Sequence, residues 1–347
     1  MLRTIAVSVT ALVMGCGVAG CSQNAATGKN ILTFGMSRDQ EIALGSEAQP
    51  LMVTEYGGKV EDPALQQYVT NIGAKMAKET EAQNPSLPWE FTLLNTDVVN
   101  AFALPGGKVF FTRGLAERLT TEAQMAGVLG HEIGHVTAQH GAQRIASQTL
   151  FNGAMAVGAV VVSTSSNDKV KQYGGYGIPA LALGGNVVML KYGRDEELEA
   201  DRLGVRYMAN VGYNPRGQME VMQVLQQLSA GSSQPEFLST HPDPAARVQQ
   251  VEGLLVGQYA YTQNSSQYQD YKDRYKTEFL DVIKKIPMPP KPAKQGALDK
   301  SQNVVIGDPT SWCPLCRGES VALKGPEAGP VPPREGVYAF FAPAAAK

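Results

Sequence analysis

The chain has 347 residues, of which 43% are hydrophobic, so it carries enough apolar side chains for a sizeable core. Its 30 Lys and Arg residues nearly balance its 32 Asp and Glu residues, and the formal net charge is −2. Nucleic-acid-binding proteins usually have a basic excess, so we expect no nucleic-acid partner. The four histidines all lie within two short segments, which directs attention to those segments.

Residues 1–20 are similar to a bacterial lipoprotein signal peptide. A short apolar run over residues 4–13 precedes Val18-Ala-Gly-Cys21, which resembles a lipobox, where the Cys is acylated and becomes the mature N-terminus. Acyl chains on Cys21 would tether the protein to a membrane without a spanning helix. Ser22 in place of Asp favours the outer membrane by the same resemblance, so we expect a periplasm-facing lipoprotein of the cell envelope. The alternative is a secreted protein cleaved near Cys21.

Local sequence signals predict a linker, a domain and an extension. We expect a polar linker at residues 21–35, a domain at residues 36–256, and a Tyr- and Pro-rich extension, partly disordered, at residues 257–347. Alternation predicts a strand near residues 88–95, and a Pro-Gly-Gly turn predicts two further strands within residues 98–112. Capping motifs and apolar spacing predict helices at residues 37–48, from residue 62 onward, and at 121–151, 187–211, 214–229 and 243–255.

The motif His131-Glu-Ile-Gly-His135 lies in the helix predicted over residues 121–151, which is apolar on several faces and should be buried and central. Two histidines four residues apart share one helix face and can bind a single Zn²⁺ ion. Glu132 would then lie beside the open position of the metal, where it can accept a proton from the attacking water. The alternative is two core histidines beside a surface Glu. Gly134 costs a helix about 1 kcal/mol relative to Ala, so helix stability does not explain it.

A hydrolytic zinc site needs a third protein ligand, and residues 194–201 are rich in carboxylates. Glu197 and Asp201 lie four residues apart on one predicted helix face. This spacing lets Glu197 reach the metal while Asp201 accepts a hydrogen bond from a ligand histidine. The alternative is a solvated charged face, which fits Asp195, Glu196 and Glu199.

Together these motifs resemble the zinc metallopeptidase family that includes the CAAX prenyl protease and the HtpX heat-shock protease. The resemblance is strongest to the soluble, periplasmic, lipoprotein-like branch of that family, and it covers about Ser37 to Leu255. The segments that carry it are Asn100-Ala-Phe, Leu104-Pro-Gly-Gly, Thr112-Arg-Gly-Leu115, His131-Glu-Ile-Gly-His135, Glu197-x-x-x-Asp201 and Ser239-Thr-His-Pro242.

The resemblance implies a mainly α, α+β fold of the gluzincin type, with the metal-binding helix at its centre and a small β-sheet. It implies one zinc ion per chain, held by His131, His135 and Glu197. It makes Glu132 the general base and places Asp201 behind the ligands. It also implies that an edge strand of the sheet pairs with an extended substrate, a sequence-tolerant mode of binding. The residues of that strand are Asn100, Ala101, Phe102 and Ala103.

The role of the remaining histidines is more open. By the resemblance, His241 faces the zinc, where it either stabilises the oxyanion or occupies the water site as a fourth ligand that keeps the enzyme latent. A capping or surface role is the alternative. Arg247 would position that segment or neutralise a carboxylate. A helix turns about 100° per residue, so His140 is predicted to lie off the metal face, either as a structural residue or as one that hydrogen-bonds to a metal ligand from behind.

These observations predict a zinc metalloendopeptidase that cleaves misfolded or stalled envelope proteins. The main alternative is a substrate-binding assembly factor or chaperone with a zinc-stabilised, latent cleft, and a weaker one is an inert structural zinc lipoprotein. Cys313 and Cys316 form a C-x-x-C pair that could close a disulfide, remain as thiols, or contribute to a metal or redox site.

Overall fold

The computed structural model describes residues 21–33, 36–81, 87–147, 191–230, 235–241 and 244–289. The signal peptide expected at residues 1–20 and the C-x-x-C pair of Cys313 and Cys316 lie outside these ranges. The fold is mainly helical with a small mixed sheet, which confirms the predicted class. None of the helices within the described ranges combines the length and the apolar character that crossing a membrane requires.

The principal sheet has three strands in the order β3 (Glu90–Leu94), β5 (Lys108–Thr112) and β4 (Ala101–Leu104). β3 runs parallel to β5, and β4 and β5 form the predicted antiparallel hairpin. Its turn contains Gly106 and Gly107 at φ +78° and +91°, a region that side chains rarely adopt, which explains the Pro-Gly-Gly sequence. β4 therefore forms one edge of the sheet, with a single strand partner among the described residues.

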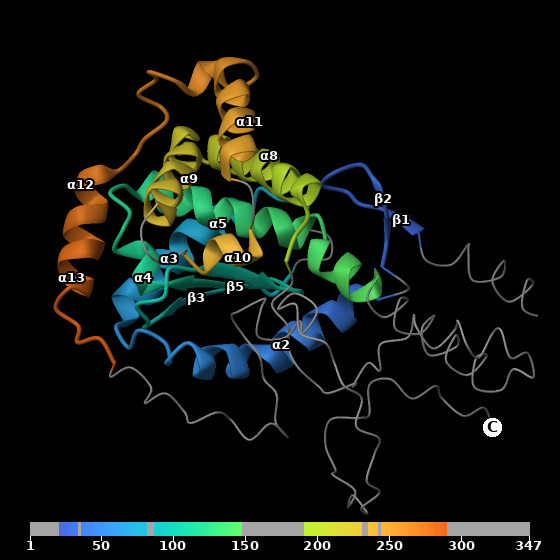
Figure 1. The fold of residues 1–347 in the computed structure, drawn as a ribbon, viewed down its shortest axis with the longest axis horizontal. Coiled ribbons are helices and arrows are strands. Elements are labelled where there is room, and N and C mark those ends of the chain that lie inside the picture. The colour runs from blue at the N-terminus through green and yellow to red at the C-terminus, as the bar shows by residue number, and fades with distance from the viewer. Residues whose placement is uncertain are drawn as a thin grey trace, which may run out of the picture. The chain divides into compact units, whose positions relative to one another are not determined.

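Helices cover both faces of this sheet. Figure 1 shows α2 (Arg38–Glu55) on the opposite side of the sheet from α5 (Glu122–Thr137). α3 (Pro63–Ala77) packs against β3 and α5, and α8 (Arg194–Asn210) packs along α5. Every residue of α5 is buried, and its predicted capping box between Thr121 and Gln124 is present. The helix that carries the His-Glu motif thus lies between the sheet and α8.

α5 is shorter than the sequence predicts. It ends at Thr137, whereas the predicted helix continued without a break to about residue 151. Residues 138 and 139 form a turn in which Gln139 has a left-handed φ of 58°, and helical structure resumes over residues 140–147. α8 also starts later than predicted, because residues 191–193 are not helical and the Glu196 side chain accepts a hydrogen bond from Gly193 N (2.6 Å).

The segment expected to be a polar linker begins with ordered structure. β1 (Cys21–Gln23) and β2 (Asn30–Leu32) pair as a short antiparallel hairpin. Asn24 in its loop is buried, and its side-chain amide donates to Thr137 O at the end of α5 (2.9 Å). This N-terminal hairpin, residues 21–33, is therefore docked against the metal-motif helix.

The packed region also extends beyond the boundary expected at residue 256. The helical segments α12 (Lys272–Arg274), η2 (Tyr275–Leu280) and α13 (Asp281–Ile283) follow one another, and Tyr275, Phe279 and Ile283 are fully buried in the main core. The remaining described elements are α4 (Arg113–Ala116), α9 (Arg216–Ser229), α10 (Phe237–Thr240), α11 (Pro244–Val256) and η1 (Ala260–Thr262). Residues 257–289 thus contribute to the same core as α3 and α5.

Candidate active site

Two histidines of α5 and one carboxylate of α8 meet in the interior. His131 and His135 lie one turn apart, and their Nε2 atoms are 3.0 Å from each other. Glu197 of α8 places Oε1 3.4 Å from His135 Nε2 and Oε2 3.5 Å from His131 Nε2. All three side chains are buried, so their polar atoms lie close together without contact with bulk water.

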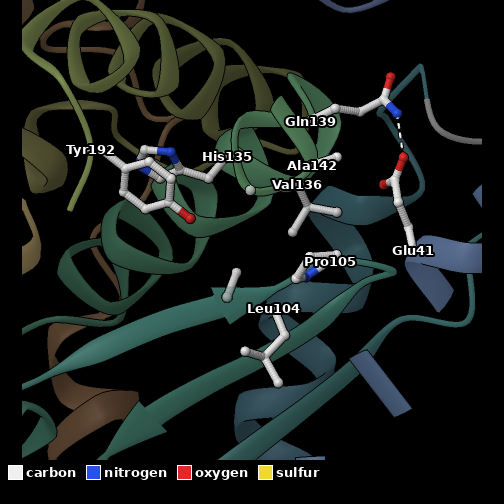
Figure 2. A pocket seen from close by; sticks show the side chains of 10 residues that line it. Glu41, Leu104, Pro105, His135, Val136, Gln139, Ala142 and Tyr192 are labelled. Atoms are coloured by element: carbon white, nitrogen blue, oxygen red, sulfur yellow. Dashed lines mark hydrogen bonds between the residues drawn. The ribbon is translucent and has the colours of Figure 1, made fainter. Parts of the chain in front are cut away.

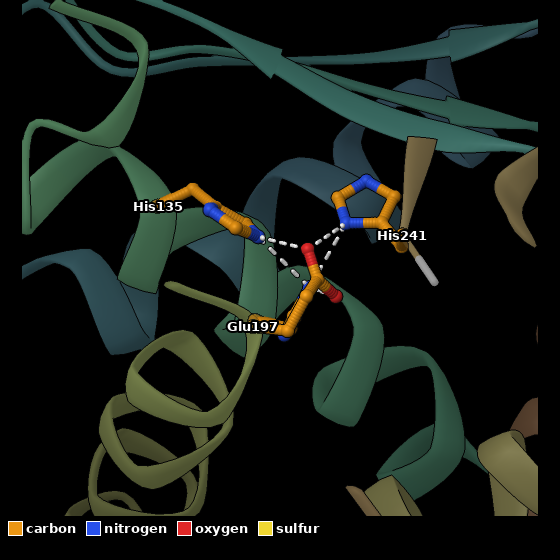
Figure 3. Close-up of side chains that lie close together, drawn as sticks. His135, Glu197 and His241 are labelled. Atoms are coloured by element: carbon orange, nitrogen blue, oxygen red, sulfur yellow. Dashed lines mark hydrogen bonds and ion pairs between the residues drawn. The ribbon is translucent and has the colours of Figure 1, made fainter. Parts of the chain in front are cut away.

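A third imidazole completes the cluster. His241 follows α10, and its Nδ1 lies 2.9 Å from Glu197 Oε1 and 3.3 Å from His131 Nε2. Figure 3 shows His135 and His241 on either side of the Glu197 carboxylate. One donor atom from each of the four residues lies within 4.8 Å of all the others. Three imidazoles and a carboxylate are donors that zinc favours, so the set fits a metal ion of this kind.

Asp201 and Arg247 lie directly behind His131. Asp201 Oδ1 accepts a hydrogen bond from His131 Nδ1 (2.8 Å), so Nε2 is the ring nitrogen that faces the cluster. Arg247 of α11 donates through Nε to Asp201 Oδ2 (2.7 Å) and its Nη1 lies 2.8 Å from Glu197 Oε2. The Gln218 amide of α9 also donates to Asp201 Oδ1 (2.9 Å). His131 is therefore held in one orientation by charged and polar groups from three helices.

The buried charges shift one another's protonation. Burial and the Arg247 charge oppose protonation of His131, but the Asp201 and Glu197 carboxylates outweigh them and raise its pKa to about 9. Burial and the neighbouring His131 hold the pKa of His135 well below its usual range. Burial opposes ionisation of Glu197, yet His241 and Arg247 hold its pKa well below that of an exposed Glu. The two histidines of α5 thus have pKa values shifted in opposite directions beside Glu197.

Glu132 differs from the other members because its carboxylate has no hydrogen-bond partner within the described part of the chain. Both oxygens are buried, and His241 Nε2 lies 3.6 Å from Oε1. Burial raises the pKa of Glu132 above its ordinary value. Buried polar atoms are nearly always satisfied, so two orphaned oxygens beside the donor cluster indicate a place where another molecule binds.

Comparison with known proteins assigns the family. Peptidase family M48 matches residues 63–255, which is more than half of the chain and includes the whole donor cluster. The chain belongs to peptidase family M48. Members of a metallopeptidase family bind a metal cofactor, and the buried His and Glu group is the place in the described M48 domain that could hold it.

The M48 domain is similar to named bacterial and mitochondrial proteins. The chain is 30% identical over 224 residues to the beta-barrel assembly-enhancing protease of Escherichia coli (strain K12), a match that covers 62% of this chain and 45% of that protein. The chain is also 30% identical over 213 residues to the mitochondrial metalloendopeptidase OMA1 of Arabidopsis thaliana, covering 60% of this chain and 40% of that protein. The chain thus spans less than half the length of these relatives.

Two aromatic rings of the M48 site were not identified from the sequence. Tyr192, just before α8, stacks on His135 with ring centroids 3.9 Å apart, and Figure 2 shows the two rings face to face. Phe237 of α10 stacks on His241 at 4.3 Å. The Tyr192 amide also donates to Thr240 O (3.0 Å), which ties the chain before α8 to α10. Neither ring carries a local sequence signal, because each is brought to its histidine by tertiary packing.

The predicted substrate strand coincides with β4 and the residue before it. Asn100 is buried, and its amide donates to Glu236 Oε1 (2.8 Å) and to the Tyr56 hydroxyl (3.1 Å). The backbone amide of Phe237 donates to Val99 O (3.1 Å), so the segment that carries His241 is anchored where β4 begins. Of the strand residues, Ala101 and Phe102 are buried and Ala103 is partly exposed.

A small pocket lies at the other end of β4. Leu104 and Pro105 line it from the β4–β5 hairpin, and Val136 lines it from α5 (Figure 2). His135 and Tyr192 also contribute to its wall. An apolar recess therefore lies between the edge strand and a member of the donor cluster.

Proposed function

We propose that this chain is a zinc-dependent endopeptidase that cleaves misfolded or stalled proteins of the cell envelope. The observation that carries the proposal is the buried set of His131, His135, Glu197 and His241 beside the unpaired Glu132 carboxylate. Membership of peptidase family M48 supports the same chemistry. The gluzincin type of fold, with the His-Glu helix at its centre, is part of the proposal.

His131, His135 and Glu197 would hold one zinc ion, with Asp201 and Arg247 fixing His131 and Glu197 in place. Such an ion supplies Lewis acidity, which polarises a peptide carbonyl and makes water a better nucleophile. Glu132 takes the proton from the attacking water at its carboxylate and then passes it to the leaving amine. Its raised pKa favours this exchange, because a carboxylate with a pKa nearer neutrality both accepts and returns a proton readily.

His241 could act in catalysis as a hydrogen-bond donor, or keep the resting enzyme latent as a fourth metal ligand. If its segment moves away from Glu197, its ring can donate a hydrogen bond to the developing oxyanion. The extended peptide would pair with β4 through backbone hydrogen bonds. Backbone pairing is tolerant of sequence, which suits substrates recognised by their unfolded state.

The proposed location is the periplasmic side of the outer membrane, with Cys21 acylated. The lipobox-like sequence supports the tether. The name of the Escherichia coli relative refers to the assembly of beta-barrels, and this supports envelope proteins as the substrate class. Unfolded envelope polypeptides are therefore the proposed partners.

One specific observation favours a second candidate, a substrate-binding assembly factor with a latent cleft. His241 Nδ1 lies within the donor set, 2.9 Å from Glu197 Oε1, where it could act as a fourth ligand. A fully coordinated metal lacks the open position that hydrolysis needs. In that case the cleft would bind unfolded chains and cleave them rarely.

The substitution Glu132→Gln separates the two candidates. It removes the proton acceptor, keeps the size of the side chain, and leaves the proposed metal ligands unchanged. We expect bound zinc to stay near one ion per chain and digestion of a denatured outer-membrane protein to fall at least about 100-fold. A variant that digests as fast as the parent would refute the proposed base. A variant that no longer digests protein, yet fully corrects the envelope defect of cells that lack the parent protein, would support the assembly factor.

A further inference from the structure

The turn that follows α5 places His140 against His135 of the donor cluster. In a continuous helix the fifth residue after His135 would lie off the metal face. The turn at residues 138 and 139, with Gln139 at φ 58°, redirects the chain instead. As a result His140 Nδ1 lies 2.8 Å from His135 Nδ1, and both rings are buried.

The hydrogen bonds around His140 fix which nitrogen of each ring carries the proton. His140 Nε2 is 3.3 Å from Glu199 Oε2, and a carboxylate can only accept, so Nε2 carries the hydrogen. His140 Nδ1 is then free to accept from His135 Nδ1–H. This leaves the Nε2 lone pair of His135 directed at His131 and Glu197. His140 thus accepts a hydrogen bond from Nδ1 of His135 and orients that ring, as Asp201 does for His131.

The N-terminal hairpin supports this arrangement from outside. Lys29 Nζ lies 2.7 Å from Glu199 Oε1, on the carboxylate that accepts from His140. Asn24 donates to Thr137 O (2.9 Å), the last residue of α5 before the turn. Gln139 itself is held on the other side by a hydrogen bond to Glu41 of α2 (Figure 2). The turn that places His140 is therefore secured by two segments distant in sequence.

We propose that His140 is a positioning residue for His135, and that the N-terminal hairpin, through Lys29 and Asn24, keeps His140 in place and so strengthens metal retention. The inference rests on the proposed metal site. The hairpin begins at Cys21, the proposed point of lipid attachment, so the segment nearest the membrane acts on the metal centre through three side chains: Lys29, Glu199 and His140.

The test measures zinc affinity of the full chain by competition with a chromophoric chelator, and the melting temperature of each metal-free variant. His140→Ala removes the acceptor and should weaken zinc binding about 10–100-fold. His140→Gln keeps an acceptor oxygen, so we expect its affinity to stay much closer to that of the parent. If both variants lower the melting temperature equally and bind zinc as tightly as the parent, His140 only fills the core and the inference is wrong.

The hairpin is tested by Lys29→Ala, with Lys276→Ala as its matched control. Both lysines are largely exposed and pair with a carboxylate, but Lys276 pairs with Asp281, away from the cluster. Exposed pairs contribute little, so Lys29→Ala should weaken zinc binding only up to about fivefold, and the control should not. Equal affinity in both variants would refute the role of Lys29. If His140→Ala does not fold, Lys29→Ala and Asn24→Ala decide the question by the same readout.

A last pair of measurements separates this inference from the proposed function. If the parent and His135→Ala bind zinc equally, or neither binds it, the proposed metal site fails. If the parent binds zinc, His135→Ala does not, and His140→Ala binds as the parent does, only the positioning role fails.

Discussion

Asp201 and Arg247 form a buried ion pair on which the orientation of His131 depends. Arg247 donates to both Asp201 oxygens, at 2.7 and 2.8 Å, and Asp201 in turn accepts from His131. Breaking a buried pair by removing one partner typically costs about 3–5 kcal/mol, because it leaves a charge uncompensated in the interior. The pair therefore joins the stability of the core to the geometry of the site.

The pKa of Asp201 predicts how the metal-free protein responds to acid. Burial alone would raise this pKa, but Arg247 and His131 outweigh burial and hold it below the ordinary value of about 3.9. A depressed pKa stabilises the fold above the unfolded value, and this stability is lost as the pH falls through the folded value. We expect the free energy of unfolding to decline below about pH 4. Asp201→Asn should be less stable at pH 7 and depend less on pH in this range.

Urea unfolding of the metal-free parent and of Asp201→Asn between pH 7 and pH 3 checks this expectation. If the free energy of unfolding changes with pH equally in the two proteins, Asp201 does not contribute to the pH dependence.

Some site residues can be predicted from sequence and others cannot. His131, His135 and Glu132 follow from a spacing within one helix, which is a local property. Tyr192 and Gln218 reach the cluster only through tertiary packing, and no periodic pattern identifies them. Helical spacing predicts His140 off the metal face, as a structural or hydrogen-bonding residue, but it does not predict contact with His135, because no local signal marks the left-handed turn at Gln139.

At the scale of elements, the site depends on how closely α5 and α8 approach. A Cβ atom added to Gly134 of α5 would lie 2.8 Å from Ala200 O of α8. One added to Gly204 of α8 would lie 3.0 Å from His131 N of α5. Glycine at both positions lets the two backbones touch, and this brings Glu197 within reach of the histidine pair. The packing thus explains Gly134, which helix propensity does not.

Enlarging Gly134 should therefore damage both stability and metal binding. In Gly134→Val the side chain meets backbone rather than a movable side chain, so α5 and α8 must separate. We expect a loss of about 1–3 kcal/mol in unfolding free energy and weaker zinc binding. Gly253→Ala in α11 is the matched control, because nothing lies within 4 Å of the added atom. It should stabilise the protein by up to about 1 kcal/mol.

Chelator competition and denaturant unfolding of both variants test this account. Unchanged zinc affinity in a folded Gly134→Val protein would mean that the helix spacing does not position Glu197.

The boundaries of the elements follow from sequence where the signal is local. The capping boxes at Ser37 and Thr121 mark helix starts, and both are present in the structure. Pro-Gly-Gly marks the turn of the β4–β5 hairpin. The interruption after Thr137 is different, because partners from the N-terminal hairpin and α2 hold it, and they lie far away in sequence.

At the scale of the whole molecule, the C-terminal part of the described chain belongs to the core. Tyr275 and Phe279 stack on each other, and Tyr275 donates to Ala116 O (2.8 Å). Arg274 pairs with Glu122 in the first turn of α5. The boundary expected at residue 256 rested on a change in composition, which does not show whether interleaved tyrosines face a core or solvent.

Truncating Phe279 should therefore destabilise the fold. Phe279 is fully buried, and Phe279→Ala should cost about 3–5 kcal/mol, because it leaves a cavity in the main core. Val256 is 77% exposed, so Val256→Ala should change stability by less than about 0.5 kcal/mol. Urea unfolding of the two variants provides the comparison. A Phe279→Ala protein as stable as the Val256→Ala protein would mean that residues 272–283 are not part of the cooperative fold.

If the buried donor cluster is a zinc-dependent peptidase centre, digestion of protein substrates must depend on the bound metal. The full-length protein is loaded with zinc and incubated with a denatured outer-membrane protein, then treated with chelator, then resupplied with zinc. We expect digestion that stops on chelation and returns with the metal. Digestion that continues at the same rate in fully metal-free protein, or the absence of digestion in protein with one zinc bound, would contradict the claim.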